Sequence, residues 1–475
     1  MKKSILLTLA LIGTLLPSNG LEVRAQNRLT SDIKYKTEIS GQFGNGDHTP
    51  FWQSANRYGL ANINNNSGYL RTSIQRDTEA DVQRNWRIGY GADLIVPINY
   101  TSHFIVQQLY GEVQYKAVRL TVGQQELPLE MKNQALTSGG MVLGANARPI
   151  PQVRIELPDF LVFKRTNNWI GVKGSVAYGF YTDNQWQRTF NAGNKDAVFT
   201  ANSRYHSKAG YLRIGNLDKF PVVLTGGVQM TCQFGGTVWN RKIKGEAPDG
   251  SYNLNGGITD YFKAFIPTGS DVTDGDNPNV MGNTVGSYLA RVEYHGKGWK
   301  ASIYGEHMFE DHSQMGWDFA WKDFLWGLEV ELPQNPIVST IVAEHMRTTD
   351  QSGPVLVAYG NKVPYIGGQD NYYNHIYGSY QHAGFVMGNP LLLSPIYNHD
   401  GRIVCYDNRI TAMHFGIQGN PLPDVSYRML YTHEKSFGNF NTPHSDPMHG
   451  DFLLIESTYK PHQLPGISFT ASYGM

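Results

Sequence analysis

The sequence predicts an all-β protein, a transmembrane antiparallel β-barrel, from three observations. Several runs alternate apolar and polar residues with the period of two that a β-strand requires. Charged residues make up only 17% of the chain and aromatic residues 12%, yet the mean hydropathy is −0.38, which suits strands that alternate between lipid and water. Past residue 26, no apolar run reaches the roughly 18 residues of a spanning helix, so a membrane crossing would need a closed barrel.

The N-terminus has the pattern of a secretory signal peptide. Lys2 and Lys3 precede a short apolar run at residues 5–16, and small residues at positions 23 and 25 predict cleavage before Gln26. We therefore expect residues 1–25 to be a signal peptide and residues 26–475 to form one outer-membrane barrel. No cysteine stands directly after the predicted cleavage site, where Gln26 lies, so a lipid anchor is not expected.

The strand prediction rests on runs whose two faces differ. In the run at 113–122, Val113 and Tyr115 share one face against Gln114 and Lys116, and a tight turn follows. The same alternation marks residues 172–181, 325–332, 425–434, 452–460 and 466–475. The polar faces are rich in Gly, Ser, Thr and Gln with single charges, which favours a wet lumen over a soluble sandwich.

Connections of unequal length separate these strands. Short ones such as 116–117 contrast with long ones at about 191–207, 242–283, 347–377 and 435–450. Outer-membrane barrels combine short periplasmic turns with long outer loops. The mature length corresponds to roughly 16 to 20 strands, which leaves a channel unless something fills it.

The charge and the cysteine content argue against a nucleic-acid partner and against a cysteine metal site. The formal net charge is zero and no basic tail is present, so no nucleic-acid partner is expected. Cys232 and Cys405 match no metal-site spacing. We expect two small apolar side chains, with a disulfide as the alternative because export would permit one.

The segment at 138–159, SGGMVLGANARPIPQVRIELPD, is rigid and basic. Pro149 and Pro151 fix the backbone and remove two donors, so these positions cannot lie inside a central strand. Arg148 and Arg154 then project from a stiff extended element. They could clamp an acidic sugar through bidentate pairing, or fasten the segment to lumen carboxylates, which we favour because lumen charges normally pair.

A polar cluster at Glu306, His307, Glu310, Asp311 and His312 has the residue types of a metal site. On a strand, however, the odd separation of His307 and His312 places them on opposite faces. We therefore expect a polar cluster at a loop end and neither a metal nor a cofactor.

Aromatic residues supply the candidates for carbohydrate binding. Trp317 and Trp321 could stack on sugar faces or anchor at the membrane interface. Tyr372, Tyr373, Asn374 and His375 combine stacking rings with hydrogen-bonding groups, as a sugar site requires. The same four residues could instead pack their loop against the rim, and the sequence leaves both alternatives open. No catalytic set stands out, and no nucleophile elbow appears.

Taken together, several segments resemble the capsule assembly Wzi family in its Bacteroidetes form. They include TPFWQSANRYGL (49–60), SGYLR (67–71), the 138–159 segment, YHSKAGYLRIGN (205–216), EHMFEDHSQMGWDFAWKD (306–323), DQSGPV (350–355) and residues 367–403. The resemblance covers essentially the whole mature chain. It implies an outer-membrane barrel of about 18 strands, with a few short helices blocking the periplasmic end. It also implies one more strand after the SFTAS segment near the C-terminus.

The resemblance further implies a non-enzymatic lectin that attaches capsular or other surface polysaccharide to the cell. We expect it to act as a monomer in contact with outer-membrane lipid. An oligosaccharide-conducting porin and an outer-membrane hydrolase are the alternatives that the residues alone leave open.

Overall fold

The computed structural model describes most of the chain after the predicted signal peptide. The described residues are 28–240, 247, 249–266, 269–274, 277–280, 282–310, 322–333, 336–351, 355–357, 364–366 and 370–475. Trp317 and Trp321 therefore lie outside them. In the described residues, no helix has the length and apolar character needed to cross a membrane.

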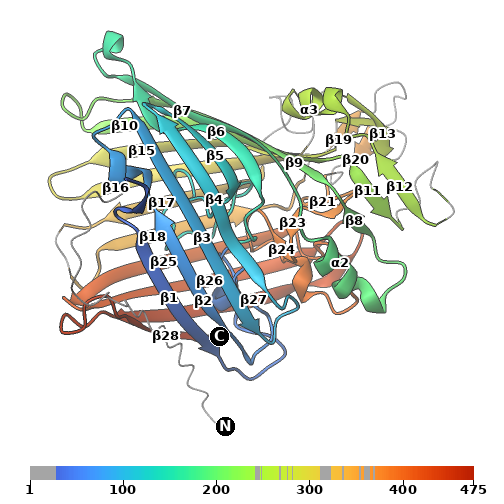
Figure 1. Cartoon of the computed structure of the whole chain (residues 1–475). Coiled ribbons are helices and arrows are strands. Elements are labelled where there is room, and N and C mark those ends of the chain that lie inside the picture. The colour runs from blue at the N-terminus through green and yellow to red at the C-terminus, as the bar shows by residue number, and fades with distance from the viewer. Residues whose placement is uncertain are drawn as a thin grey trace.

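A single antiparallel sheet of 17 strands curls into a barrel (Figure 1). Its strands are β1 (Lys34–Gln42), β2 (Ser67–Arg76), β3 (Trp86–Ile98), β4 (Ile105–Tyr115), β5 (Val118–Gln124), β6 (Gln152–Val162), β7 (Ile170–Phe180), β9 (Arg204–Ile214), β10 (Val222–Phe234), β15 (Asn283–His295), β16 (Lys300–Glu310), β17 (Phe324–Glu331), β18 (Thr340–Arg347), β25 (Ile410–Leu422), β26 (Val425–Gly438), β27 (Pro443–Tyr459) and β28 (Phe469–Gly474). Each strand pairs with the next one in this order. The predicted barrel is confirmed, with 17 strands where about 18 were expected.

The two terminal strands of the sheet run in the same direction, because both β1 and β28 begin at the end of the barrel that carries the short turns. In the described part of the chain, β1 forms its ladder with β2 and β28 forms its ladder with β27, and no ladder joins β1 to β28.

One end of the barrel has short turns and the other has long connections, as predicted. Short turns lie at 116–117, 163–169, 215–221, 296–299 and 423–424, and long connections at 43–66, 125–151, 181–203, 235–282 and 348–409. The predicted long loop at 435–450 is wrong. Asn439 Oδ1 accepts hydrogen bonds from the backbone of Asn441 and Thr442 and makes a tight turn there, so β26 and β27 continue through polar residues.

The outer surface of the barrel is apolar. Leu109, Ile155 and Ile303 are 57%, 56% and 59% exposed on strand faces that point away from the lumen. Alternate residues such as Gln114 and Thr121 are buried on the lumen side. The strands therefore have the lipid-facing and lumen-facing alternation that the sequence predicted.

Three connections fold back into the barrel and fill it. We call residues 43–66, 125–151 and 370–409 the plug. Their side chains form one core with lumen-facing strand residues. The members that the plug contributes are Phe51, Trp52, Ala55, Leu136, Met141, Val142, Tyr372, Tyr373, Tyr380, Val386, Leu391, Leu392 and Cys405.

The plug is mostly not helical, unlike the few blocking helices that the family resemblance implied. It contains α1 (Phe51–Ser54) and the 3-10 turn η5 (Pro395–Tyr397), with the two-residue bridges β21 (Asn374–His375), β22 (Gly378–Ser379), β23 (Gln381–His382) and β24 (Phe385–Val386). Prolines such as Pro149 and Pro151 cannot donate the backbone hydrogen bonds of a helix interior, and the glycines beside them disfavour helix as well.

The long-connection end carries further elements beyond the strand ends (Figure 1, right). A three-stranded sheet consists of β8 (Phe199–Ala201), β11 (Gly236–Trp239) and β12 (Ser251–Leu254). The other elements at this end are α2 (Asn184–Phe190), the 3-10 turn η4 (Asn191–Gly193), α3 (Ile258–Phe265), β13 (Gly269–Asp274) with β14 (Asn277–Val280), and β19 (Val355–Val357) with β20 (Pro364–Ile366). The 3-10 turns η2 (Thr78–Asp81) and η3 (Lys164–Thr166) lie in connections at the short-turn end, and η1 (Arg28–Thr30) precedes β1.

Candidate functional site

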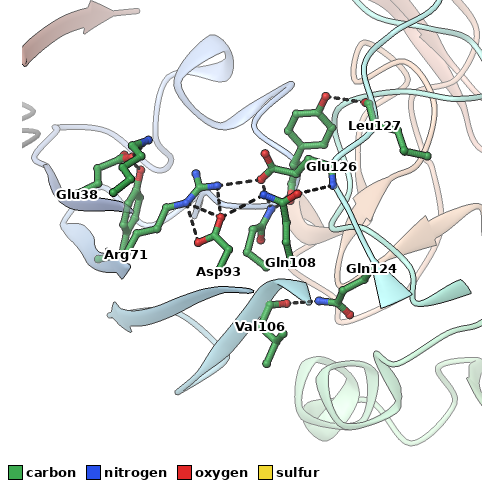
Figure 2. Close-up of polar contacts among 12 residues, drawn as sticks. Glu38, Arg71, Asp93, Val106, Gln108, Gln124, Glu126 and Leu127 are labelled. Carbon is green, nitrogen blue, oxygen red and sulfur yellow. Dashed lines mark hydrogen bonds and ion pairs between the residues drawn. The ribbon is translucent and has the colours of Figure 1, made fainter. Parts of the chain in front are cut away.

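The start of the second plug segment is fixed to the wall by Arg71 (Figure 2). Arg71, on β2, donates from Nε to both carboxylate oxygens of Asp93 on β3 at 3.0 Å. Its Nη2 also lies 3.2 Å from Glu126, the second residue of that plug segment. Gln107 donates to the same Glu126 carboxylate at 2.9 Å. A bidentate pair shared with a third charged group fixes orientation as well as contact.

Glu344, on β18, holds the middle of the same segment. Its carboxylate accepts hydrogen bonds from Thr137 Oγ1 at 2.5 Å and from the backbone N–H of Ser138 at 2.7 Å. Tyr304, across the wall on β16, donates to it at 2.5 Å. Because Glu344 is buried, its removal would leave these donors without a hydrogen-bond partner, since water does not reach the site.

Further wall charges bind the plug backbone directly. Arg291 donates to the carbonyl of Met131 at 2.8 Å and pairs with Glu329 at 2.9 Å. Arg428 donates to the carbonyl of Ala135 at 3.0 Å. Ion pairs also join Lys132 of the plug to Glu306 of β16, and Arg57 of the plug to Glu456 of β27. The lumen charges predicted from strand alternation thus serve mainly to hold the plug.

The plug segments are interlocked with one another. Tyr373 donates its hydroxyl to the carbonyl of Met141 and accepts from the backbone N–H of Asn389 at 2.9 Å. The backbone N–H of Gly144 donates to the carbonyl of Met387 at 2.9 Å. A Cβ at Gly144 would lie 2.5 Å from the carbonyl oxygen of Gly388. Gly144 therefore allows two plug segments to approach each other closely.

Among the residues that the structure describes, two cavities lie between the plug and the wall. The larger, about 310 Å³, runs along the inner face of β5, β6 and β7 and is lined by charged side chains of both signs. The smaller, about 270 Å³, lies against β1, β2, β27 and β28 and is lined largely by hydroxyl groups, including those of Ser40, Thr458 and Ser472.

Both predicted arginines line the larger cavity. Arg154 Nε lies 2.6 Å from Glu156 on its own strand, and Arg119 lies 3.7 Å from the same carboxylate. Glu156 belongs to the same 138–159 segment as Arg154, so this pair does not fasten the segment to another part of the wall, and that role of Arg154 stays a prediction. Arg148 makes no ion pair within the described residues, and burial lowers the pKa of its guanidinium to about 10, an effect that Asp183 partly offsets.

The four candidates in the Tyr372 region do not form an open site together. Tyr372 and Tyr373 are 0% exposed in the plug core, so neither ring offers a free face, and packing is the role that the structure describes for them. Asn374 binds the backbone of Cys405 as both donor and acceptor, at 2.8 Å each. Asn374 and His375 are half-buried, and a carbohydrate role for them stays a hypothesis.

The described residues of the predicted polar cluster bind backbone groups, and both cysteines are buried. Glu310 accepts a hydrogen bond from the backbone of Tyr373 at 2.6 Å, and a ring nitrogen of His307 lies 2.7 Å from the carbonyl of Asp323. In the part of the chain that the structure describes, no three metal-binding side chains converge. Asp311 and His312 lie outside the described residues. Cys232 and Cys405 are buried and not joined to each other.

Sequence reasoning missed an aromatic pair on the three-stranded sheet. Phe199 and Trp239 are direct cross-strand partners, and their rings stack 4.6 Å apart at an angle of 3°. The guanidinium of Arg188, on α2, lies 5.4 Å and 5.7 Å from the two ring centroids. The residues are 40 positions apart in the chain, so only the pairing of β8 with β11 brings them together. A short alternating run, GTVW at 236–239, was the available signal.

Comparison with solved structures finds barrels of the same architecture. Wzi of Escherichia coli, described as an outer-membrane protein involved in group 1 capsule assembly and as a carbohydrate-binding β-barrel, superposes with a TM-score of 0.52 at 14% identity, over 94% of this chain and 85% of that one. OpdL of Pseudomonas aeruginosa gives 0.39 at 8% identity, over 93% and 95%, and the channel DcaP of Acinetobacter baumannii gives 0.36 at 8%, over 93% and 97%.

No protein-family model and no curated protein matches the chain. The architecture that this chain shares with the E. coli Wzi structure is that of an outer-membrane β-barrel. Together with the apolar exterior of its strands, this fold places the chain in an outer membrane.

Proposed function

We propose that this chain is a non-enzymatic, lectin-like barrel that attaches capsular or other surface polysaccharide to the outside of the cell. It would be a Wzi-type capsule assembly protein, acting as a monomer in outer-membrane lipid. The observation that carries the proposal is the filled lumen. Wall charges on β2, β15, β16, β18, β26 and β27 are used to hold chain segments inside the barrel.

A filled lumen argues against the porin alternative. An open porin has a polar lumen that holds water along its length. Here the middle of the barrel is occupied by an apolar core that includes Trp52, Tyr373 and Leu391. Surface binding does not need a passage through the membrane, so the long-connection end is left as the working face.

Likeness to the E. coli Wzi barrel supports the same proposal, since that protein is described as carbohydrate-binding and involved in capsule assembly. A long polymer can be held by many weak contacts, because each further contact on the same chain is effectively intramolecular. Many copies of a barrel with a modest site would then suffice to retain polysaccharide.

The test compares cells with and without the gene. We expect the deletion strain to synthesise the same amount of surface polysaccharide but to release most of it into the medium, and the intact gene supplied in trans to restore retention. Equal retention in both strains would contradict the proposal. Stable labelling of the purified protein by a fluorophosphonate would instead favour the hydrolase alternative.

A further inference from the structure

The three-stranded sheet of β8, β11 and β12 has two unlike faces. Val238 on the inner face is 0% exposed and packs with Ile376 and Tyr377 of the plug. The side chains of neighbouring residues on a strand alternate between faces, so Trp239, Thr237 and Phe199 project from the opposite face. The sheet is thus fixed on one side and open on the other.

The open face has a flat aromatic surface beside a small residue. Trp239 stacks on Phe199 of β8 on one side, and its cross-strand partner on the other side, in β12, is Ser251. A serine side chain is too short to cover an indole ring. Trp239 is accordingly partly exposed although its neighbour Val238 is fully buried.

Polar groups surround this aromatic surface. Thr237 donates to Asn253 Oδ1 at 2.7 Å, which orients the amide, and Asn253 is exposed. Arg188 is exposed beside both rings and has no carboxylate partner within the described residues. A stacking surface, an oriented amide and a cation are the groups that recognise an acidic sugar ring.

Anchoring at the membrane interface does not account for this pair. Interfacial aromatic residues lie on the outer face of barrel strands at the ends of the bilayer. Trp86 and Tyr115, with rings 4.6 Å apart at the short-turn end, are such a pair, and Trp86 is 56% exposed. The three-stranded sheet instead lies beyond the ends of the barrel strands (Figure 1).

We propose that the open face of this sheet, formed by Phe199, Trp239, Arg188 and Asn253, binds a uronate-type residue of the retained polysaccharide. The sugar ring would stack on Trp239, its hydroxyl groups would accept from Asn253, and its carboxylate would pair with Arg188. This inference rests on the proposed function and names the part of the molecular surface that performs it.

The experiment uses the full-length protein in detergent and measures binding to surface polysaccharide extracted from cells that carry the gene. Affinity electrophoresis gives the dissociation constant from the retardation of the protein. Four proteins are compared: wild type, Trp239→Ala, Arg188→Gln and, as the matched aromatic control, Trp86→Ala. Each is first shown to be folded by its heat-dependent migration in gels. The polymer is used native and after chemical reduction of its carboxyl groups.

We expect Trp239→Ala to bind about tenfold more weakly, since loss of one central aromatic contact typically costs at least that much. Arg188→Gln should weaken binding to the native polymer but not to the reduced one, and Trp86→Ala should bind like wild type. If the wild-type protein binds and Trp239→Ala binds equally well, this inference is overturned and the proposed function is not. Absence of wild-type binding would overturn the proposed function with it.

Discussion

Glu344 shows how a single residue connects the barrel wall to its contents. None of the alternating runs recognised in the sequence contains this residue. In the structure, its buried carboxylate accepts from Thr137, the Ser138 backbone and Tyr304. A buried acceptor with three donors is costly to remove, because each donor then has no hydrogen-bond partner and water cannot reach it to take that place.

Replacing Glu344 by alanine should therefore destabilise the protein by about 3 kcal/mol, while Glu344→Gln, which keeps one acceptor oxygen, should cost about half as much. The measurement is urea-induced unfolding in phospholipid vesicles, followed by tryptophan fluorescence. Glu331→Gln is the control: this carboxylate is 44% exposed and, among the described residues, pairs with Lys300 alone, so its loss should stay within about 0.5 kcal/mol. Equal effects at positions 344 and 331 would contradict the anchoring role.

At the scale of elements, the crossing of two plug segments depends on glycine. A Cβ at Gly388 would lie 2.0 Å from the hydroxyl of Tyr373 and 2.3 Å from the carbonyl oxygen of Met141. One of these contacts is with backbone, so the segments would have to separate. Gly193, in η4, has nothing within 4 Å of the same position and provides a control of equal chemistry.

Cys405 can report on this crossing. It is fully buried in the plug core, and burial raises the pKa of its thiol to about 12, partly offset by a contact with Ser379. At pH 8 the thiol is therefore protonated as well as inaccessible, and it should react very slowly.

In a Cys232→Ser background, we expect Gly388→Ala to speed alkylation of Cys405 by at least about tenfold, in keeping with a cost of about 1–3 kcal/mol for forced overpacking. Gly193→Ala should leave the rate unchanged. Rates measured with iodoacetamide at pH 8 decide the matter, and an unaltered rate in Gly388→Ala would show that the plug accommodates the extra atom.

Strands were predictable from the sequence and plug contacts were not, for a physical reason. Lipid on one side and polar groups on the other impose a period of two, which is visible in runs such as 113–122 and 425–434. The plug has no such period, since residues like Tyr373 and Met141 meet across 232 positions. The cost of unpaired lumen charge predicts that a lumen arginine has a carboxylate partner, but it does not predict that Arg154 pairs with Glu156 of its own segment. The burial of Tyr372 left no trace in the local sequence.

For the whole molecule, the relation between strand number and lumen content decides what the barrel can do. A barrel of 17 strands is wide enough for an aqueous channel. Here that width is taken up by the plug core, and the two cavities described beside it measure about 310 and 270 Å³. Trp52, Tyr372 and Leu391, at the apolar centre, line neither cavity. Both cavities therefore lie beside the plug core and do not pass through it.

The purified protein in a planar lipid bilayer should accordingly show no stepwise conductance in 1 M KCl at about 100 mV, a potential worth about 2.3 kcal/mol per elementary charge. Deleting residues 130–147 removes the backbone that Arg291, Glu344 and Arg428 hold. That variant, once shown to insert, should conduct in discrete steps, because lumen charges then face water. Steps in the wild-type protein would mean that ions pass the plug, and the porin alternative would replace the lectin proposal.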